Sequence, residues 1–335
     1  MRILIRDHLK PFSHIPGTVC LLPHTFYQCR IYPALIEIYD VKNVRPELIK
    51  TIPVKLPGPV EQFTVQFDME KGSIRVWGFS SGQFFRYRIF GQGEIFPENL
   101  FASSLFEKGV AKPEFGTESI VKERLSLGIH KSQDVEQIRK RGDIHEFFPF
   151  WFRLGQLVPK IPKAKGGVFD LLDECMGLGQ FDIVKAKQLF AVAFRGIFSP
   201  SLVDEEHLGF SLSKANGSPI SLVQEGASWI RSLFFQQVGN TYLILPKLPM
   251  ECRSGKLVGF VSEEAVFDIE WTKNCLRRMV IFGEKEGLLR LILPKGIRKF
   301  RFREMGSKKE STMKSSENLL SIAHEKIYFI DRIET

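Results

Sequence analysis

Hydrophobic and polar residues alternate with a period of two over much of the first hundred residues, a pattern typical of half-buried β-strands. Three such segments follow one another closely, at residues 63–67, 74–79 and 84–90. Lys71-Gly72 and Ser80-Ser81-Gly82 supply turn residues between them. We therefore predict an antiparallel meander here, preceded by a strand at 31–39. Together these elements form an N-terminal antiparallel β domain over residues 1–116.

The pattern becomes helical from about residue 117, where apolar residues recur every three to four positions. We predict helices at residues 133–141, 143–157, 169–176, 183–198 and 227–237. The second of these is apolar or aromatic on most sides, so we expect it to be buried. Pro159, Pro162 and Gly166-Gly167 interrupt the pattern after it. These elements make up a reduced helical segment over residues 117–240.

Alternation typical of strands returns after residue 240. We predict strands at residues 242–245, 256–261, 265–271, 277–282, 288–293, 298–302 and 326–330. The stretch 283–287, with a glycine at each end, is interpreted as a hairpin loop, and the polar residues 304–318 as a mobile linker. The fold class is therefore α+β, with an N-terminal antiparallel β domain, a reduced helical middle and a C-terminal β-sandwich-like domain over residues 241–335.

The composition is that of a folded protein with a large core. Of 335 residues, 44% are hydrophobic and 25% are charged, which excludes a disordered or collagen-like chain. No apolar run approaches the ~18 residues of a membrane-spanning helix, so we expect no membrane span.

Charges at Arg2, Arg6 and Asp7 interrupt the first apolar run, which argues against a secretory signal. Five cysteines without C-x-x-C spacing disfavour zinc and disulfide frameworks, so we predict a reducing, cytoplasmic setting.

The formal net charge is +9, and its placement bears on possible nucleic-acid binding. Residues 295–303 contain five basic residues interleaved with Phe300 and Phe302. Arginines beside aromatic rings could hold a nucleic-acid backbone or an anionic surface. The alternative is a strand that buries its phenylalanines and turns its cations to solvent. We favour the alternative, and nucleic acid is not the partner we expect.

Residues 226–293 contain an ordered series of short motifs. A helix beginning Gly226-Ala-Ser-Trp leads into Leu245-Pro-Lys-Leu-Pro249, then Gly255-Lys-Leu-Val-Gly-Phe260, Asp268-Ile-Glu-Trp271 and Leu276-Arg-Arg-Met-Val-Ile281. This order resembles the end of the α/α-barrel glycoside hydrolases of the inverting α-fucosidase type. In that family the last barrel helix is followed by L-L-P-A-L-P, G-x-V-x-G-L and a strand that ends in Trp. The resemblance covers about a fifth of the chain.

The resemblance implies a β–helical–β arrangement, and an oligosaccharide or glycogen-like polymer as ligand. Twelve barrel helices need about 200 residues, more than residues 117–235 supply. The family's Asp before the last barrel helix corresponds to Ser221, and Glu225 is the nearest carboxylate. We expect Glu225 one residue before a helix, where the helix dipole favours a negative charge. We therefore predict a non-catalytic, carbohydrate-binding or structural relative of these enzymes.

An active hydrolase is the first alternative. Inverting glycosidases need two carboxyl groups about 6.5–9.5 Å apart, and Glu225 with Asp173 or Glu174 could supply them. The competing interpretation places Asp170, Asp173 and Glu174 on the solvated face of an amphipathic helix. The separation of these side chains discriminates between the two interpretations: carboxylates outside the two-carboxylate range, or on opposite faces, exclude the hydrolase.

Four aromatic residues are candidates for stacking on sugar rings, and each could instead be a core residue: Trp77, Trp229, Tyr242 and Trp271. Two further groups resemble metal ligands only in their residue types, namely residues 204–207 and the set His8, His14, His24, Cys20 and Cys29. Neither has metal-ligand spacing. No phosphate-binding glycine loop occurs, and we predict no metal and no cofactor.

Overall fold

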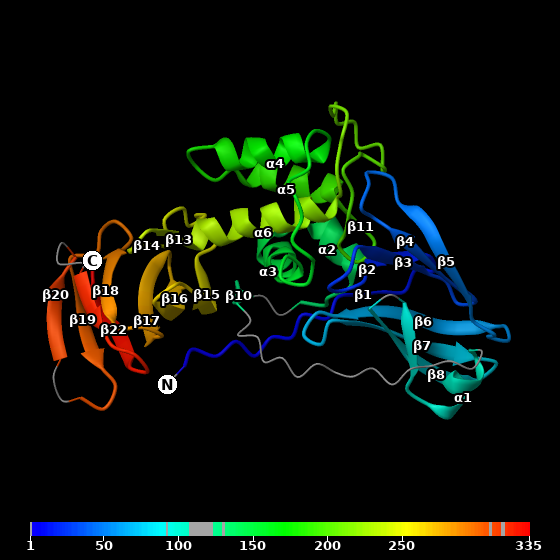
Figure 1. The fold of residues 1–335 in the computed structure, drawn as a ribbon, viewed down its shortest axis with the longest axis horizontal. Helices are drawn as coiled ribbons and strands as arrows, with labels where there is room; N and C mark the ends of the chain where they lie inside the picture. Colours follow the sequence, from blue (N-terminus) through cyan, green and yellow to red (C-terminus); the bar gives the residue numbers. More distant parts are fainter. Residues whose placement is uncertain (1, 92, 107–122, 129–130, 308–309, 316–318) are drawn as a thin grey trace.

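The computed structural model describes residues 2–91, 93–106, 123–128, 131–307, 310–315 and 319–335. Strands dominate this part of the chain, and six helices accompany them. The arrangement is a β-rich α+β fold: sheets lie at both ends of the molecule and the larger helices lie between them (Figure 1). The predicted fold class is confirmed at this level. The predicted domain boundary at 116/117 falls outside the described residues.

The N-terminal region contains two antiparallel sheets. One has the order β1 (Phe12–Ser13), β6 (Val60–Asp68), β7 (Ser73–Ser80), β8 (Gln83–Phe90) and β9 (Glu94–Pro97). The other consists of β2 (Thr18–Leu21), β3 (Tyr27–Ile31), β4 (Leu35–Asp40) and β5 (Glu47–Pro53). A short helix, α1 (Leu100–Ser104), follows β9. The predicted meander is confirmed as β6–β7–β8, because each strand pairs antiparallel with the next.

The alternation of residues along β8 matches the alternation of side chains between the two faces of a strand. Phe85, Tyr87 and Ile89 are fully buried, whereas Phe84 on the other face is exposed. Successive side chains of a strand point to opposite faces, so one face of β8 joins the core and the other meets solvent. The register with β7 places Tyr87 opposite Val76 on this buried face.

The helical middle consists of α2 (Val135–Arg141), α3 (Ile144–Leu154), α4 (Val168–Gly177), α5 (Ile183–Ala193) and α6 (Ile220–Phe234). As predicted, α3 is buried over most of its length. Most helix limits lie within three residues of the prediction, and two differ more. Helix α5, predicted to extend to residue 198, ends at Ala193, because β11 (Phe194–Arg195) pairs with β12 (Ser199–Pro200). The last helix begins at Ile220 rather than 227, because Ile220, Leu222 and Val223 are buried as helical core residues.

The C-terminal region also contains two sheets. The larger has the order β10 (Arg124–Ser126), β15 (Ser254–Val261), β16 (Ala265–Thr272), β17 (Cys275–Gly283), β22 (Ile327–Glu334), β19 (Lys299–Glu304) and β20 (Glu310–Lys314). The smaller has the order β13 (Phe235–Val238), β14 (Thr241–Ile244), β18 (Gly287–Ile292) and β21 (Leu319–Ile322). Phe235 and Tyr242 of the smaller sheet each lie 5.1 Å from the ring of Phe267 in the larger one. The two sheets therefore pack against each other.

Three predicted details of this region are wrong. Residues 283–287 do not form a hairpin, because β17 and β18 belong to different sheets. Residues 310–314, predicted as linker, form β20 and pair with β19. Residues 124–126 and 235–238, assigned to the helical segment, add strands to the C-terminal sheets. β10 pairs with β15, which is distant in sequence, whereas β20 and β13 pair with the neighbouring strands β19 and β14.

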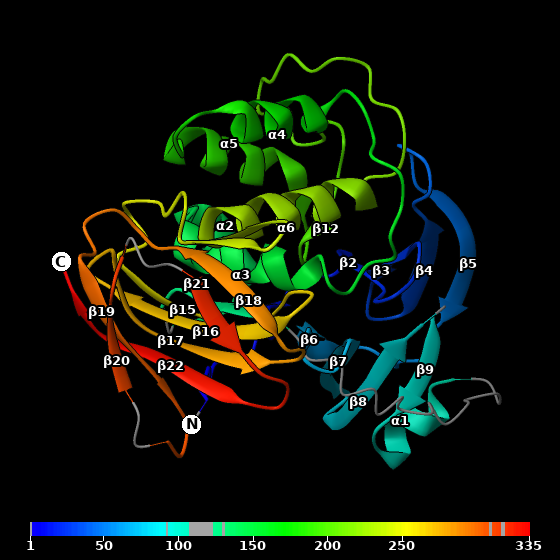
Figure 2. The same ribbon diagram turned by 60° about the vertical axis from the view of Figure 1, so that its left-hand side comes forward.

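Residues 2–11, which we call the strap, run below the helices in Figure 1, from the C-terminal β region to the N-terminal one. The amide of Ile3 donates to the Asp268 carboxylate in β16 at 3.2 Å. The carbonyl of Pro11 accepts from the amide of Phe67 in β6 at 2.8 Å. The strap therefore links the C-terminal sheet to the N-terminal sheet, and its first residues do not lie in the N-terminal β region where the sequence analysis placed them. Figure 2 shows the two β regions flanking the helices from another side.

Among the described residues, none of the helices has the length and apolar character needed to cross a membrane.

Candidate functional site

The predicted carboxylates lie on two helices and are not brought together in one pocket. Glu225 lies in the second turn of α6, since that helix begins at Ile220. The expected position before a helix N-terminus is therefore wrong, and the dipole effect, which falls off within the first turn, does not explain this residue. Asp173 and Glu174 on α4 are about half exposed and pair with Lys163 at 2.6 Å and with Lys185 at 2.9 Å. These pairs match the solvated-face interpretation of α4.

Glu225 nevertheless lines a pocket, here called the α4–α6 pocket, with a cavity volume of about 240 Å³. Glu225, Ser228, Trp229 and Ser232 contribute from α6. Their spacing of three, four and seven residues places them on one face of the helix. The loop after α4 adds Gln180 and Phe181, and Lys247 adds a cation. Glu225 is the one carboxylate among the described residues that line this pocket.

Trp229, one of the predicted sugar-stacking residues, lines the same pocket but is only 6% exposed. Three rings surround it: Phe148 at 5.7 Å, Phe181 at 6.2 Å and Trp151 at 6.4 Å between centroids. Most of its surface is therefore used in core packing. Phe181, which is partly exposed, is the second aromatic residue in the lining of this pocket.

Of the other three predicted stacking residues, two are buried in the core and one is half-buried. Tyr242 and Trp271 are fully buried, so neither offers a ring face to a sugar, and the stacking role predicted for them is wrong. Trp271 donates from Nε1 to the carbonyl of Cys252 at 2.8 Å. Trp77 is half-buried on β7, opposite Arg86 of β8 and two residues from Arg75 on the same face. It remains the one of these three with a surface available to a ligand.

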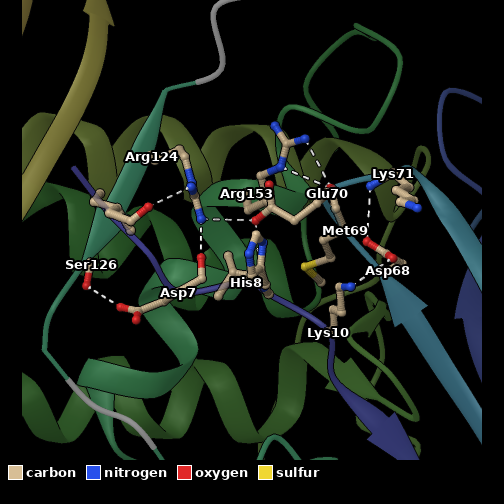
Figure 3. Close-up of polar contacts among 12 residues, drawn as sticks. Asp7, His8, Lys10, Asp68, Met69, Glu70, Lys71, Arg124, Ser126 and Arg153 are labelled. Atoms are coloured by element: carbon tan, nitrogen blue, oxygen red, sulfur yellow. Dashed lines mark hydrogen bonds and ion pairs between the residues drawn. The ribbon is translucent and has the colours of Figure 1, made fainter. Parts of the chain in front are cut away.

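A second cavity, the strap cleft, lies between the strap, β10 and α3, with a volume of about 280 Å³. Arg124 at the start of β10 holds the strap in place: its guanidinium donates to the carbonyls of Ile5 and Asp7. The same guanidinium pairs with Glu70 at 3.2 Å (Figure 3). Ser126, also in β10, donates to the Asp7 carboxylate at 2.9 Å. One strand of three residues thus fixes the middle of the strap.

Arg153 of α3 forms part of the wall of the strap cleft and is buried. Its guanidinium donates twice to the carbonyl of Met69 (Figure 3). It also donates once to the Gln156 side chain. Burial lowers the pKa of Arg153, the nearby Glu70 raises it, and the like charge of Arg124 lowers it. A buried cation with carbonyl and amide partners adds positive potential to this cleft. No local sequence pattern marks Arg124 and Arg153 as neighbours, because they lie 29 positions apart in the sequence and the fold alone brings them together.

The residue groups of metal-ligand type do not assemble. Asp204 accepts hydrogen bonds from the amides of Leu208, Gly209 and Phe210 at 3.0–3.2 Å, so its carboxylate shapes a turn. Cys20 and Cys29 lie opposite each other in β2 and β3, fully buried, with burial raising the pKa of both thiols. Within the described ranges, no cluster of three or more His, Cys, Asp and Glu side chains is arranged to hold a metal ion.

The basic segment 295–303 is partly neutralised by acidic neighbours. Arg301 pairs with Asp331 at 2.7 Å and with Glu310 at 2.9 Å, and Arg303 lies 3.6 Å from Asp331. Phe300 is buried, as the strand interpretation predicts. Arg301 and Arg303 of β19 are therefore engaged within the sheet, whereas Lys295, Arg298 and Lys299 are exposed.

The residues that carry the resemblance to glycoside hydrolases have structural roles in this fold. Asp268 is buried and accepts from the amides of Gly259 at 2.9 Å and Ile3 at 3.2 Å. Leu245 and Ile269 are core residues. Comparison of the chain with protein-family models and with curated proteins finds no match to either.

Proposed function

We propose that this protein binds an oligosaccharide without cleaving it, and that the α4–α6 pocket is the binding site. The observation that carries the proposal is that Glu225 and Trp229, one helical turn apart on α6, line one pocket together with polar side chains. Pockets that bind small molecules combine apolar walls with a few polar groups that fix orientation. An aromatic wall beside amide, hydroxyl and charged groups suits a sugar ring.

The size of the pocket supports a small ligand unit. Its volume of about 240 Å³ lies just below the ~300 Å³ at which pockets for drug-sized ligands begin. A single sugar residue of a longer chain is an occupant of this scale. Glu225 and Lys247 would accept from and donate to its hydroxyl groups.

The arrangement of carboxylates favours binding over hydrolysis. Inverting glycoside hydrolysis needs a second carboxyl group facing the first across the scissile bond. The predicted partners of Glu225, Asp173 and Glu174, form ion pairs with Lys163 and Lys185 and do not line this pocket. An active glycoside hydrolase that uses these three residues is therefore the weaker of the two proposals.

Calorimetric titration of the purified protein with neutral oligosaccharides, including fucosylated ones, tests this function. We expect binding that Glu225→Gln weakens by about tenfold, since a hydrogen bond to a charged group contributes about 1.5–3 kcal/mol. Glu174→Gln is the matched control, because it removes an exposed carboxylate outside the pocket. Binding unchanged by Glu225→Gln would place the site elsewhere, and release of reducing sugar by the wild-type protein would contradict the non-catalytic proposal.

A further inference from the structure

A third cavity adjoins the strap cleft along the strap, and we call it the basic groove. Its volume is about 570 Å³, and it shares Ile5, Asp7 and Ser126 with the strap cleft. The strap forms one wall, and β15, β16 and β17 of the larger C-terminal sheet form the other. At this size the groove can take several units of an extended ligand.

The walls of this groove carry five cationic side chains, contributed by three separate elements: Arg2, Arg6, Lys256, Arg277 and Arg278. Two acidic side chains, Asp7 and Glu270, face them. The side chains of Arg2, Arg277 and Arg278 are 49%, 64% and 45% exposed. Clustered cations of this kind in a concave surface raise the local positive potential and attract anions.

The acidic neighbours neutralise only part of this charge. Arg278 donates to Glu270, and Arg277 lies 3.7 Å from the same carboxylate, so two arginines share one acid. Lys256 donates to the carbonyl of Leu4 at 3.2 Å. Arg6 has neither an ion pair nor a hydrogen bond within the described part of the chain. Arg6 and Arg277 are therefore the cations most available to a ligand.

The remaining surface of the groove indicates what kind of anion it suits. Ser126, Gly128, Ser254, Gly255 and Thr272 form a small, hydroxyl-bearing part of the lining. Trp271, the one aromatic ring among the lining residues that the structure describes, is 1% exposed. Proteins that bind single-stranded nucleic acid use exposed rings on which bases stack. Hydroxyls and arginines without such rings favour a ligand with carboxylate or sulfate groups and no bases.

We propose that the basic groove binds an acidic polysaccharide, whose carboxylate or sulfate groups pair with Arg6, Arg277 and their neighbours. Arginine is well suited to this task, because its planar guanidinium can form two parallel hydrogen bonds to one such group. The inference rests on the proposed function in one respect, namely that the ligand is a saccharide. It names a second site with a different chemistry from the α4–α6 pocket.

The test measures binding of fluorescent heparin and oligogalacturonate fragments at several salt concentrations. The double variant Arg6→Gln/Arg277→Gln is compared with Lys295→Gln/Lys299→Gln, which removes the same charge from the basic segment 295–303. We expect the groove variant to weaken binding by roughly tenfold and to lower the salt slope by about two, as when two cation–anion contacts are lost. The control variant should stay within about threefold of wild type.

Glu270→Gln provides a second variant with the opposite expected effect. It frees Arg277 and Arg278 from their shared acid, so the affinity for the acidic fragments should rise severalfold. Equal loss of binding in both double variants, or no gain with Glu270→Gln, would overturn the assignment. An oligothymidylate that binds as tightly at equal salt would overturn the ligand class. Neutral-sugar binding that Glu225→Gln weakens, with no binding of acidic fragments, would overturn this inference and leave the proposed function standing.

Discussion

The indole ring of Trp151 in α3 occupies the space where a side chain at Gly226 in α6 would lie. The ring Nε1 donates to the carbonyl of Val223, one turn earlier in α6, at 3.2 Å. Close approach of the two helices at this point therefore depends on the absence of a Cβ atom at position 226. The contact also fixes the face of α6 that carries Glu225 and Trp229 toward the α4–α6 pocket.

Gly226→Ala should destabilise the protein. The new methyl group would overlap the Trp151 ring, and overpacking of a filled core costs about 1–3 kcal/mol. Urea unfolding measures the change. Gly177→Ala in α4 is the matched control, since no atom lies near a Cβ there and the substitution should be neutral or slightly stabilising. Equal midpoints for the two variants would contradict the role of Gly226.

Arg124→Ala should release the middle of the strap. The variant loses the hydrogen bonds to the carbonyls of Ile5 and Asp7 and the pair with Glu70. Bonds of this type contribute about 1.5–3 kcal/mol each, so amide exchange of the strap should accelerate by at least about tenfold. Hydrogen exchange followed by mass spectrometry tests this. Arg139→Ala, which removes a pair with Glu206, should leave strap exchange unchanged.

Asp143 begins α3 as its N-cap and accepts hydrogen bonds from His145. Burial by itself raises the pKa of Asp143, but hydrogen bonds and charge from His145, together with Lys131, lower it below 3.8. A carboxyl group with a lowered pKa in the folded state stabilises that state above the unfolded-state pKa, and this contribution is lost as pH falls through the folded-state pKa.

Asp143→Asn keeps a capping side chain and removes this ionisation. We expect wild type to exceed Asp143→Asn in free energy of unfolding at pH 6, and the difference to shrink toward zero as pH falls below about 4. Asp143→Ala should lose about 1 kcal/mol more, because it also removes the cap. Urea titrations at pH 6 and pH 3 supply the comparison. If the difference in free energy of unfolding between wild type and Asp143→Asn grew as pH falls, the predicted direction of the pH dependence would be wrong.

Iodoacetamide should modify the native protein at Cys275 and spare the other four cysteines. Cys275 is exposed, whereas Cys20, Cys29, Cys175 and Cys252 are buried. The thiolate is the reactive form, and burial raises the pKa of Cys175 to about 11. Peptide mapping at pH 8 should find one alkylated site, and all five after denaturation. Rapid alkylation of Cys20 or Cys29 in the native state would contradict the packing of β2 against β3.

The strands of the meander could be predicted from sequence, because alternation along β8 depends on which of its own residues are apolar. The same holds for the burial of α3, where aromatic residues occupy most faces. The α4–α6 pocket is predicted only in part: the sequence indicates Glu225 and Trp229 as candidate site residues, but no local pattern shows that they share a pocket. For Tyr242 and Trp271 the sequence leaves stacking and core packing open, because a residue's type does not reveal whether both faces of its ring are covered; the structure shows that both are core residues.

The sequence by itself determined the β–helical–β order, the apolar segments that supply the buried cores and the residue types available for binding. Only the tertiary structure decided that the strap lies against β10 and the C-terminal sheet, that β17 and β18 enter different sheets, and that Arg6 meets Arg277 at one groove. The physical reason is that periodicity reports on contacts within a turn of helix or along a strand. The pairing of segments that are distant in sequence depends on the packing of the whole chain. It therefore cannot be predicted from the sequence of any one segment.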